Sequence, residues 1–170
     1  MNNAALAVAS DFVKSGIEKA GIPLTQTLEA YLSITFARFI GKEIRVDMLT
    51  VRITRAFDAN APAEGLRALA DECLIACAFF EARLRRNGAI RHYVALGQMT
   101  YDAASLTEQA YGFVHMRDVI ATAAGQNDPE DHRVLLDQAR AGSIKAKSAL
   151  SEGNVVLGPW SRPKPGLLWS

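Results

Sequence analysis

Arginine side chains are concentrated at one corner of the expected structure. Arg83, Arg85 and Arg86 close one segment of helical periodicity, and Arg91 opens the next segment after a short turn. Guanidinium groups make paired hydrogen bonds with carboxylates and phosphates, so this corner is suited to binding an anion. Two ordinary explanations compete with that one. Basic residues at the C-terminal end of a helix complement its dipole, and Glu81 lies four residues before Arg85, the spacing of an intrahelical ion pair.

The candidate ligand site at this corner consists of Arg83, Arg86, Arg91, His92 and Tyr93. His92 and Tyr93 follow the arginines directly and offer hydrogen bonding or aromatic stacking to a bound anion. The expected ligand is a small carboxylate or phosphate, held in a pocket between helices by a binding protein or by an enzyme.

No residue pattern identifies a catalytic group. The sequence contains neither a Gly-x-Ser-x-Gly elbow nor a glycine-rich phosphate loop. A general acid or base is conceivable among four acidic residues: Glu29, Asp71, Glu72 and Glu81. Because nothing in the sequence favours one of them, the catalytic residues are unknown and enzymatic activity is left open.

Neither a metal nor a cofactor is expected. Cys73 and Cys77 lie four residues apart on one face of a helix, but two thiols do not complete a metal site and their neighbours are typical of a core. We predict that both are buried free thiols. The histidines His92, His115 and His132 fall on three successive segments, without the Glu-x-x-His spacing of di-iron carboxylate sites.

The charge balance limits the expected partners. The 170-residue chain has 19 Lys and Arg against 18 Asp and Glu, a net charge of +1. No long-range field therefore attracts nucleic acid or an anionic membrane, and nucleic-acid binding is disfavoured. No apolar run reaches the roughly 18 residues of a membrane-spanning helix, and the N-terminal stretch lacks the basic leader of a signal peptide. We predict a cytoplasmic protein without a membrane anchor.

Apolar residues recur at helical spacing through most of the chain, which predicts an all-α, single-domain helical bundle of about six to eight helices over residues 1–152. The main helices are expected at Leu24 to Gly41, Pro62 to Asn87, Ile90 to Leu106 and Thr107 to Ala124, with a short helix from about Val46 to Asp58. The Pro62 to Asn87 helix should run without interruption. It should bury a stripe of seven residues: Leu66, Leu69, Cys73, Leu74, Cys77, Phe80 and Leu84.

Two further features indicate close packing. Gly97 and Gly112 lie inside expected helices, where glycine costs about 1 kcal/mol relative to alanine. Close approach of a neighbouring helix accounts for both glycines, and room for a ligand is the alternative. Residues 153–170 form an irregular, proline-containing tail that carries Trp160 and Trp169. Because large aromatic side chains gain by burial, we expect the tail to dock on the helical domain or on a partner subunit.

One stretch of the chain resembles uncharacterised bacterial helical proteins. It consists of Asp71 to Phe80, with paired aromatic residues, then the basic turn Arg83 to Arg86, then the Tyr-x-x-x-Gly-x-x-x-Tyr pattern of Tyr93 to Tyr101. The likeness extends over Leu24 to Ala104. It implies a helical fold and no particular activity, ligand or catalytic residue.

The preferred function is therefore a non-enzymatic interaction or regulatory role. Helical faces and the tryptophan-bearing tail offer contact area for self-association as a homodimer, or for another protein partner. One alternative is a small-anion binding protein or enzyme with its pocket at the arginine corner. The second alternative is nucleic-acid contact through the same arginines, against which the near-neutral net charge argues.

Overall fold

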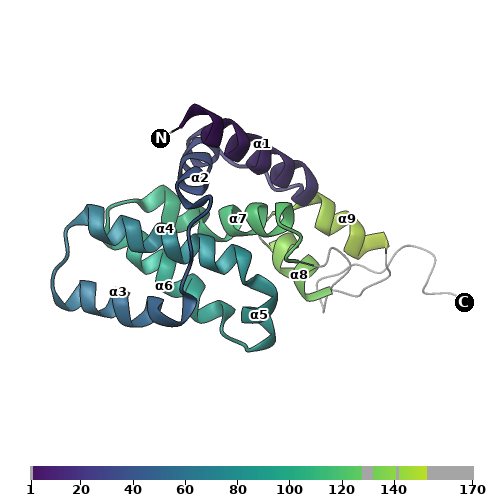
Figure 1. The fold of residues 1–170 in the computed structure, drawn as a ribbon. Coiled ribbons are helices and arrows are strands. Elements are labelled where there is room, and N and C mark those ends of the chain that lie inside the picture. Colours follow the sequence, from purple (N-terminus) through teal and green to yellow (C-terminus); the bar gives the residue numbers. More distant parts are fainter. Residues whose placement is uncertain (1, 128–131, 141, 153–170) are drawn as a thin grey trace, which may run out of the picture.

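The computed structural model describes residues 2–127, 132–140 and 142–152, and within these ranges it contains helices and no strand (Figure 1). The prediction of an all-α fold is confirmed. The elements are α1 (Asn3–Ala20), α2 (Gln26–Phe39), the short 3-10 helix η1 (Val46–Met48), α3 (Leu49–Asp58), α4 (Ala63–Phe79), α5 (Glu81–Arg86), α6 (Ile90–Ala103), α7 (Thr107–Ala123), α8 (His132–Arg140) and α9 (Ile144–Glu152). None of the described helices is both long enough and apolar enough to span a bilayer. The tail of residues 153–170, predicted to dock, lies outside the described residues.

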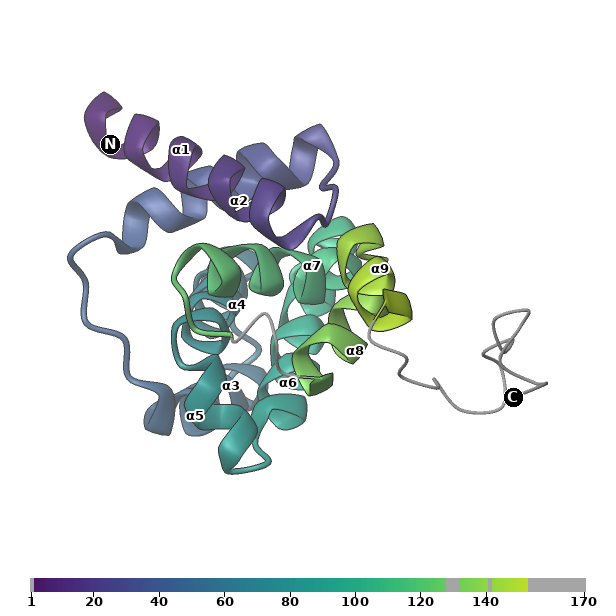
Figure 2. The same ribbon diagram turned by 90° about the vertical axis from the view of Figure 1, so that its right-hand side faces the viewer.

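Helix α4 lies at the centre of the molecule. It packs along α6 and α7, while α1 lies across α7 and α2 (Figures 1 and 2). The apolar stripe expected from the sequence faces this core, since Leu66, Leu74 and Leu84 are buried. Cys73 and Cys77 are buried free thiols, as predicted.

The expected central helix is not continuous. At Phe80 the backbone adopts φ −109° and ψ 17°, away from the helical values near −63° and −42°, and the segment divides into α4 and α5. The bend turns the Glu81 side chain into the interior, where it is fully buried and pairs with Arg85 and Arg117. The sequence around the bend contains neither Gly nor Pro. The bend is accompanied instead by the ion pairs of Glu81. The apolar spacing alone therefore predicted one helix, which was wrong.

The glycines inside the helices mark close approaches, as predicted. A methyl group added at Gly97 would overlap the Phe113 ring across the α6 and α7 contact. One added at Gly112 would lie 2.5 Å from Leu28 Cδ1, across the contact of α7 with α2. Both positions therefore let α7 lie closer to its neighbours than an alanine would permit.

The connection between α8 and α9 is fastened to the end of α1. Ser143 donates a hydrogen bond of 2.7 Å to the Ala20 carbonyl, and Lys145 Nζ donates one of 3.1 Å to the Lys19 carbonyl. These carbonyls belong to the last turn of α1, which has no intrahelical donors for them. The two bonds fasten the start of α9 to the end of α1. Helix α8, which precedes α9, forms one wall of the cavity described next.

Candidate functional site

A cavity of about 890 Å³ opens between α5, α6, α7 and α8. Its polar lining is mostly basic and comprises Arg85, Arg91, Gln98, His115, Arg117, Asp137 and Arg140. Apolar side chains complete the wall, among them Ile90, Val94, Val114 and Leu136. The volume falls in the range of about 300–1,000 Å³ that is typical of small-molecule sites.

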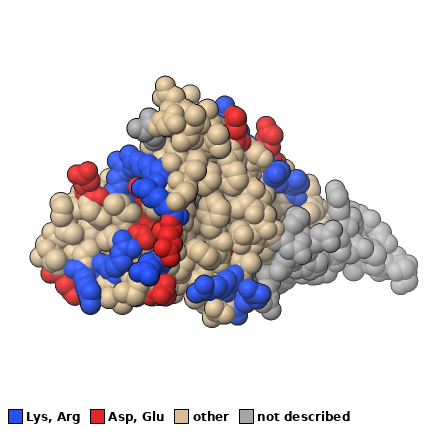
Figure 3. All heavy atoms as spheres, viewed as in Figure 1, with Lys and Arg blue, Asp and Glu red and all other residues tan. Residues whose placement is uncertain are grey.

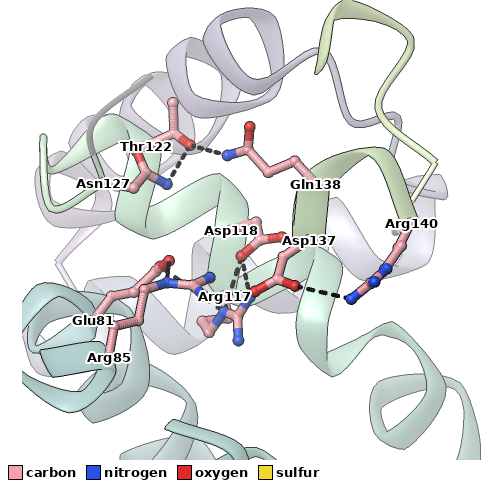
Figure 4. Close-up of polar contacts among 9 residues, drawn as sticks. All are labelled: Glu81, Arg85, Arg117, Asp118, Thr122, Asn127, Asp137, Gln138 and Arg140. Atoms are coloured by element: carbon pink, nitrogen blue, oxygen red, sulfur yellow. Dashed lines mark hydrogen bonds and ion pairs between the residues drawn. The ribbon is translucent and has the colours of Figure 1, made fainter. Parts of the chain in front are cut away.

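Arg117 of α7 is the buried cation of this cavity, with 5% of its side chain exposed. Its Nε donates a 2.9 Å hydrogen bond to Asp118 Oδ1, and its Nη2 donates to the same oxygen. On its other side, Glu81 Oε2 lies 3.9 Å from Arg117 Nε. Figure 4 shows the guanidinium group between these two acidic side chains. Such burial is tolerated because the charge is paired.

Arg85 connects α5 to α8 along the cavity wall. Its Nε donates to Glu81 Oε1 at 2.7 Å, which confirms the predicted intrahelical pair, and its Nη1 donates to Asp137 Oδ2 at 2.6 Å (Figure 4). The remaining nitrogen, Nη2, is buried and has no hydrogen-bond partner among the described residues. A buried cationic donor without a partner is costly, and a bound acceptor would satisfy it.

The charged groups in and beside the cavity have a net positive charge. Four arginines, Arg85, Arg91, Arg117 and Arg140, stand against three acidic residues, Glu81, Asp118 and Asp137. Desolvation by burial raises the pKa of Glu81 and that of Asp118, while Arg117 opposes both shifts. A proton taken up by either carboxyl group would make the cavity more positive still.

Only one residue of the predicted arginine-corner site lines this cavity, and it is Arg91. The guanidinium group of Arg83 lies 5.9 Å from the centroid of the Phe80 ring, and Arg86 is exposed to solvent on α5. Neither side chain reaches the cavity.

The two aromatic members of the predicted site face α3 and the segment before it. His92 Nε2 lies 3.0 Å from Thr50 Oγ1, and the Tyr93 hydroxyl donates a 3.2 Å hydrogen bond to the Val46 carbonyl. These contacts hold η1 and α3 against α6. The five predicted residues are therefore divided between two faces of α6 and the outer face of α5.

The residues that sequence reasoning missed are Arg117, Asp137 and Arg140, together with His115 as a cavity residue. The available signal was the adjacent charge pair Arg117 and Asp118 between the apolar residues Met116 and Val119 of α7, because an unpaired charge is not tolerated in a buried stretch of helix. His115 does not gather with other candidate metal ligands. Among the described residues, no three His, Cys, Asp or Glu side chains form a group able to hold a metal ion.

A second polar cluster is centred on Asp71 of α4. Asp71 Oδ1 accepts hydrogen bonds from the Tyr31 hydroxyl at 2.6 Å and from the Tyr101 hydroxyl at 2.7 Å. These bonds join α2, α4 and α6 through one carboxylate oxygen. Burial, followed by the neighbouring Asp71 charge, raises the pKa of Tyr31 to about 12, and the same two causes raise the pKa of Tyr101.

The tyrosine cluster predicts a loss of stability in alkali. A tyrosine in the unfolded chain ionises near pH 10, so the unfolded state releases its protons first. The contribution of Tyr31 is thus fully present below pH about 10 and is lost as the pH rises toward about 12. Ultraviolet absorbance should show a phenolate transition near pH 12 whose amplitude is smaller, by one tyrosine, in Tyr31→Phe than in the unmodified chain. An unchanged amplitude in the variant would contradict the assignment.

The chain was compared with protein-family models, with curated proteins and with solved structures, and none of the three comparisons found a match. The chemistry of the cavity therefore has to be inferred from its own residues. They provide cationic hydrogen-bond donors beside an apolar surface, which suits an anionic group joined to an apolar body.

Proposed function

We propose that the protein binds a small organic anion in the cavity between α5, α6, α7 and α8. The observation that carries this proposal is the Arg85 Nη2 nitrogen, a buried donor without a partner in the part of the chain that the structure describes. Arg85 lines the cavity together with Arg91, Arg117 and Arg140. A carboxylate or phosphate supplies the missing acceptor and is neutralised by the excess positive charge.

The apolar side chains of the cavity indicate that the ligand also has an apolar portion. Ile90 and Val94 of α6, Val114 of α7 and Leu136 of α8 contribute to the wall. Each buried methylene group of a ligand gains about 0.8 kcal/mol on leaving water, whereas a small inorganic anion gains nothing from these side chains. The preferred ligand is therefore a carboxylate or phosphate that carries a hydrocarbon portion. Self-association as a homodimer and a cytoplasmic location stay predictions from the sequence.

Calorimetric titration with three probes tests this proposal. Octanoate supplies both an anion and an apolar chain, acetate supplies only the anion, and octan-1-ol supplies only the chain. We expect measurable binding of octanoate and binding at least about tenfold weaker for the other two, since each loses one of the two contributions. Equal affinity for octanoate and octan-1-ol would contradict an anion site.

Arg91 is the appropriate position for a variant because it lines the cavity yet is exposed and stands outside the buried ion network. Arg91→Ala should weaken octanoate binding about tenfold, the loss of one charge-assisted contact. Arg83→Ala is the matched control, since Arg83 lies at the same corner outside the cavity, and it should bind as the unmodified chain does. An effect of Arg83→Ala equal to that of Arg91→Ala would place the ligand elsewhere.

A further inference from the structure

A second and smaller cavity, of about 280 Å³, lies between the end of α2 and the first half of α4. Its charged lining consists of Arg38, Lys42, Glu64, Arg67 and Asp71. It shares no lining residue with the first cavity. In Figure 3, basic side chains with acidic ones beside them gather on the face where α2 passes α4.

The floor of this cavity contains a carboxylate oxygen that accepts no hydrogen bond from the residues that the structure describes. Asp71 has 4% of its side chain exposed, and its Oδ1 already accepts from two tyrosine hydroxyls. Its Oδ2 lies 3.8 Å from Arg38 Nη1 and 3.9 Å from Arg67 Nε. Both distances are too long for a hydrogen bond, which needs about 2.7–3.2 Å.

The donor facing that oxygen is also unsatisfied. Arg67 Nε is buried and has no hydrogen-bond partner within residues 2–127, 132–140 and 142–152. A buried donor without a partner costs about 1–3 kcal/mol. The carboxylate oxygen across the 3.9 Å gap from it has, in the described part of the chain, only the two long ion-pair contacts. A hydroxyl oxygen in this gap can lie about 2.8 Å from both atoms, accepting from Arg67 Nε and donating to Asp71 Oδ2.

The cations around the gap are held in place by aromatic rings. The Arg67 guanidinium carbon lies 5.1 Å from the centroid of the Tyr31 ring, and Lys42 Nζ lies 5.7 Å from the centroid of the Phe39 ring. Such cation and ring contacts restrict the side chains before a ligand arrives, which lowers the entropy cost of binding. Arg38, at the mouth, has no hydrogen-bonded acid within the described residues, because its contact with Asp71 is the long one.

We propose that this cavity binds a small hydroxylated anion, with a hydroxyl group of the ligand bridging Arg67 Nε and Asp71 Oδ2 and its anionic group on Arg38 and Lys42. Phosphate esters of short polyols and short hydroxy acids share this chemistry. The volume admits such molecules and disfavours larger ones, since typical drug-sized sites begin near 300 Å³. The site is independent of the proposed function, since the two cavities are separate.

The full chain is titrated calorimetrically with glycerol 3-phosphate, inorganic phosphate, glycerol and lactate. We expect glycerol 3-phosphate to bind about tenfold more tightly than inorganic phosphate, because only the ester places a hydroxyl in the gap. Lactate binding would show that a carboxylate can replace the phosphate, and its absence would assign the site to phosphate esters. If glycerol 3-phosphate binds no better than inorganic phosphate, or fails to bind, then no ligand hydroxyl occupies the gap and the proposal is overturned.

Two variants separate the two halves of the ligand. Arg38→Gln removes an exposed cation at the mouth of the cavity. It should weaken the binding of glycerol 3-phosphate and of inorganic phosphate about equally. Arg67→Lys keeps the positive charge but loses Nε, so it should abolish the preference for glycerol 3-phosphate over inorganic phosphate. Circular dichroism checks that each variant is folded. Retention of that preference in Arg67→Lys would overturn the bridging role of the hydroxyl.

The first cavity supplies the control. Arg91→Ala should leave glycerol 3-phosphate binding unchanged, and Arg38→Gln should leave octanoate binding unchanged. An effect of Arg91→Ala on glycerol 3-phosphate would place this ligand in the first cavity and overturn the second site. Failure of octanoate binding alone would count only against the proposed function.

Discussion

Replacing Arg117 with Met is expected to lower the free energy of unfolding by about 3–5 kcal/mol, the cost of removing one partner from a buried ion pair. Methionine fills much of the same space, so packing is largely retained. Glu81 and Asp118 stay buried, with 0% and 1% of their side chains exposed, and lose the cation that lies between them. The free energy of unfolding is measured by urea denaturation followed by circular dichroism.

The destabilisation by Arg117→Met should depend on pH with a definite sign. Burial raises the folded-state pKa of Glu81 and that of Asp118 above the ordinary values near 4, and removing Arg117 raises them further. Their contribution to stability is then fully present below pH about 4 and is lost as the pH rises through the folded-state values. The loss in free energy of unfolding caused by Arg117→Met should therefore be small in acid and largest at neutral pH.

The matched control for this variant is Arg86→Met, because Arg86 is an exposed arginine outside both cavities. It should change the free energy of unfolding by no more than about 0.5 kcal/mol. A second comparison adds Asp118→Asn to Arg117→Met, which removes one unpaired charge and should recover part of the loss. Equal effects of Arg117→Met and Arg86→Met would show that the buried network contributes no net stability.

The helices could be predicted from the sequence because their information is local. Apolar residues three and four apart define a buried stripe whatever lies against it, so α2, α6 and α7 begin and end close to their expected bounds. The bend at Phe80 is not local in this sense. It is associated with the pairing of Glu81 with Arg117, two residues far apart in the sequence, and no spacing rule reports such a contact.

The arginine corner was a poor guide to the site because helix geometry separates neighbouring side chains. Successive residues on an α-helix point about 100° apart, so residues two apart face nearly opposite sides. Arg85 therefore points inward while Arg83 points out, and Arg91, His92 and Tyr93 cannot all enter one pocket. A run of suitable residue types within one turn is thus weaker evidence of a site than charged residues on the apolar face of a helix.

Gly16→Ala is expected to have an effect comparable to that of Arg117→Met, although it adds one methyl group. A Cβ at Gly16 would overlap the backbone carbonyl oxygen of Val119 and lie 3.0 Å from Val119 Cγ1. The oxygen belongs to the helical backbone of α7 and cannot move alone, so α1 must shift away from α7. We expect the free energy of unfolding to fall by about 3 kcal/mol, the upper end of typical overpacking costs.

Gly65→Ala provides the control of opposite sign. Gly65 lies in α4, where the nearest atom to an added Cβ is 3.9 Å away. The variant should gain about 1 kcal/mol in the free energy of unfolding, the difference in helix propensity between alanine and glycine. The same chemical change is thus expected to destabilise where two helices meet backbone to backbone and to stabilise where a helix faces open space. A gain at Gly16 in the same urea denaturation experiment would show that α1 does not pack against α7 in solution as it does in Figures 1 and 2.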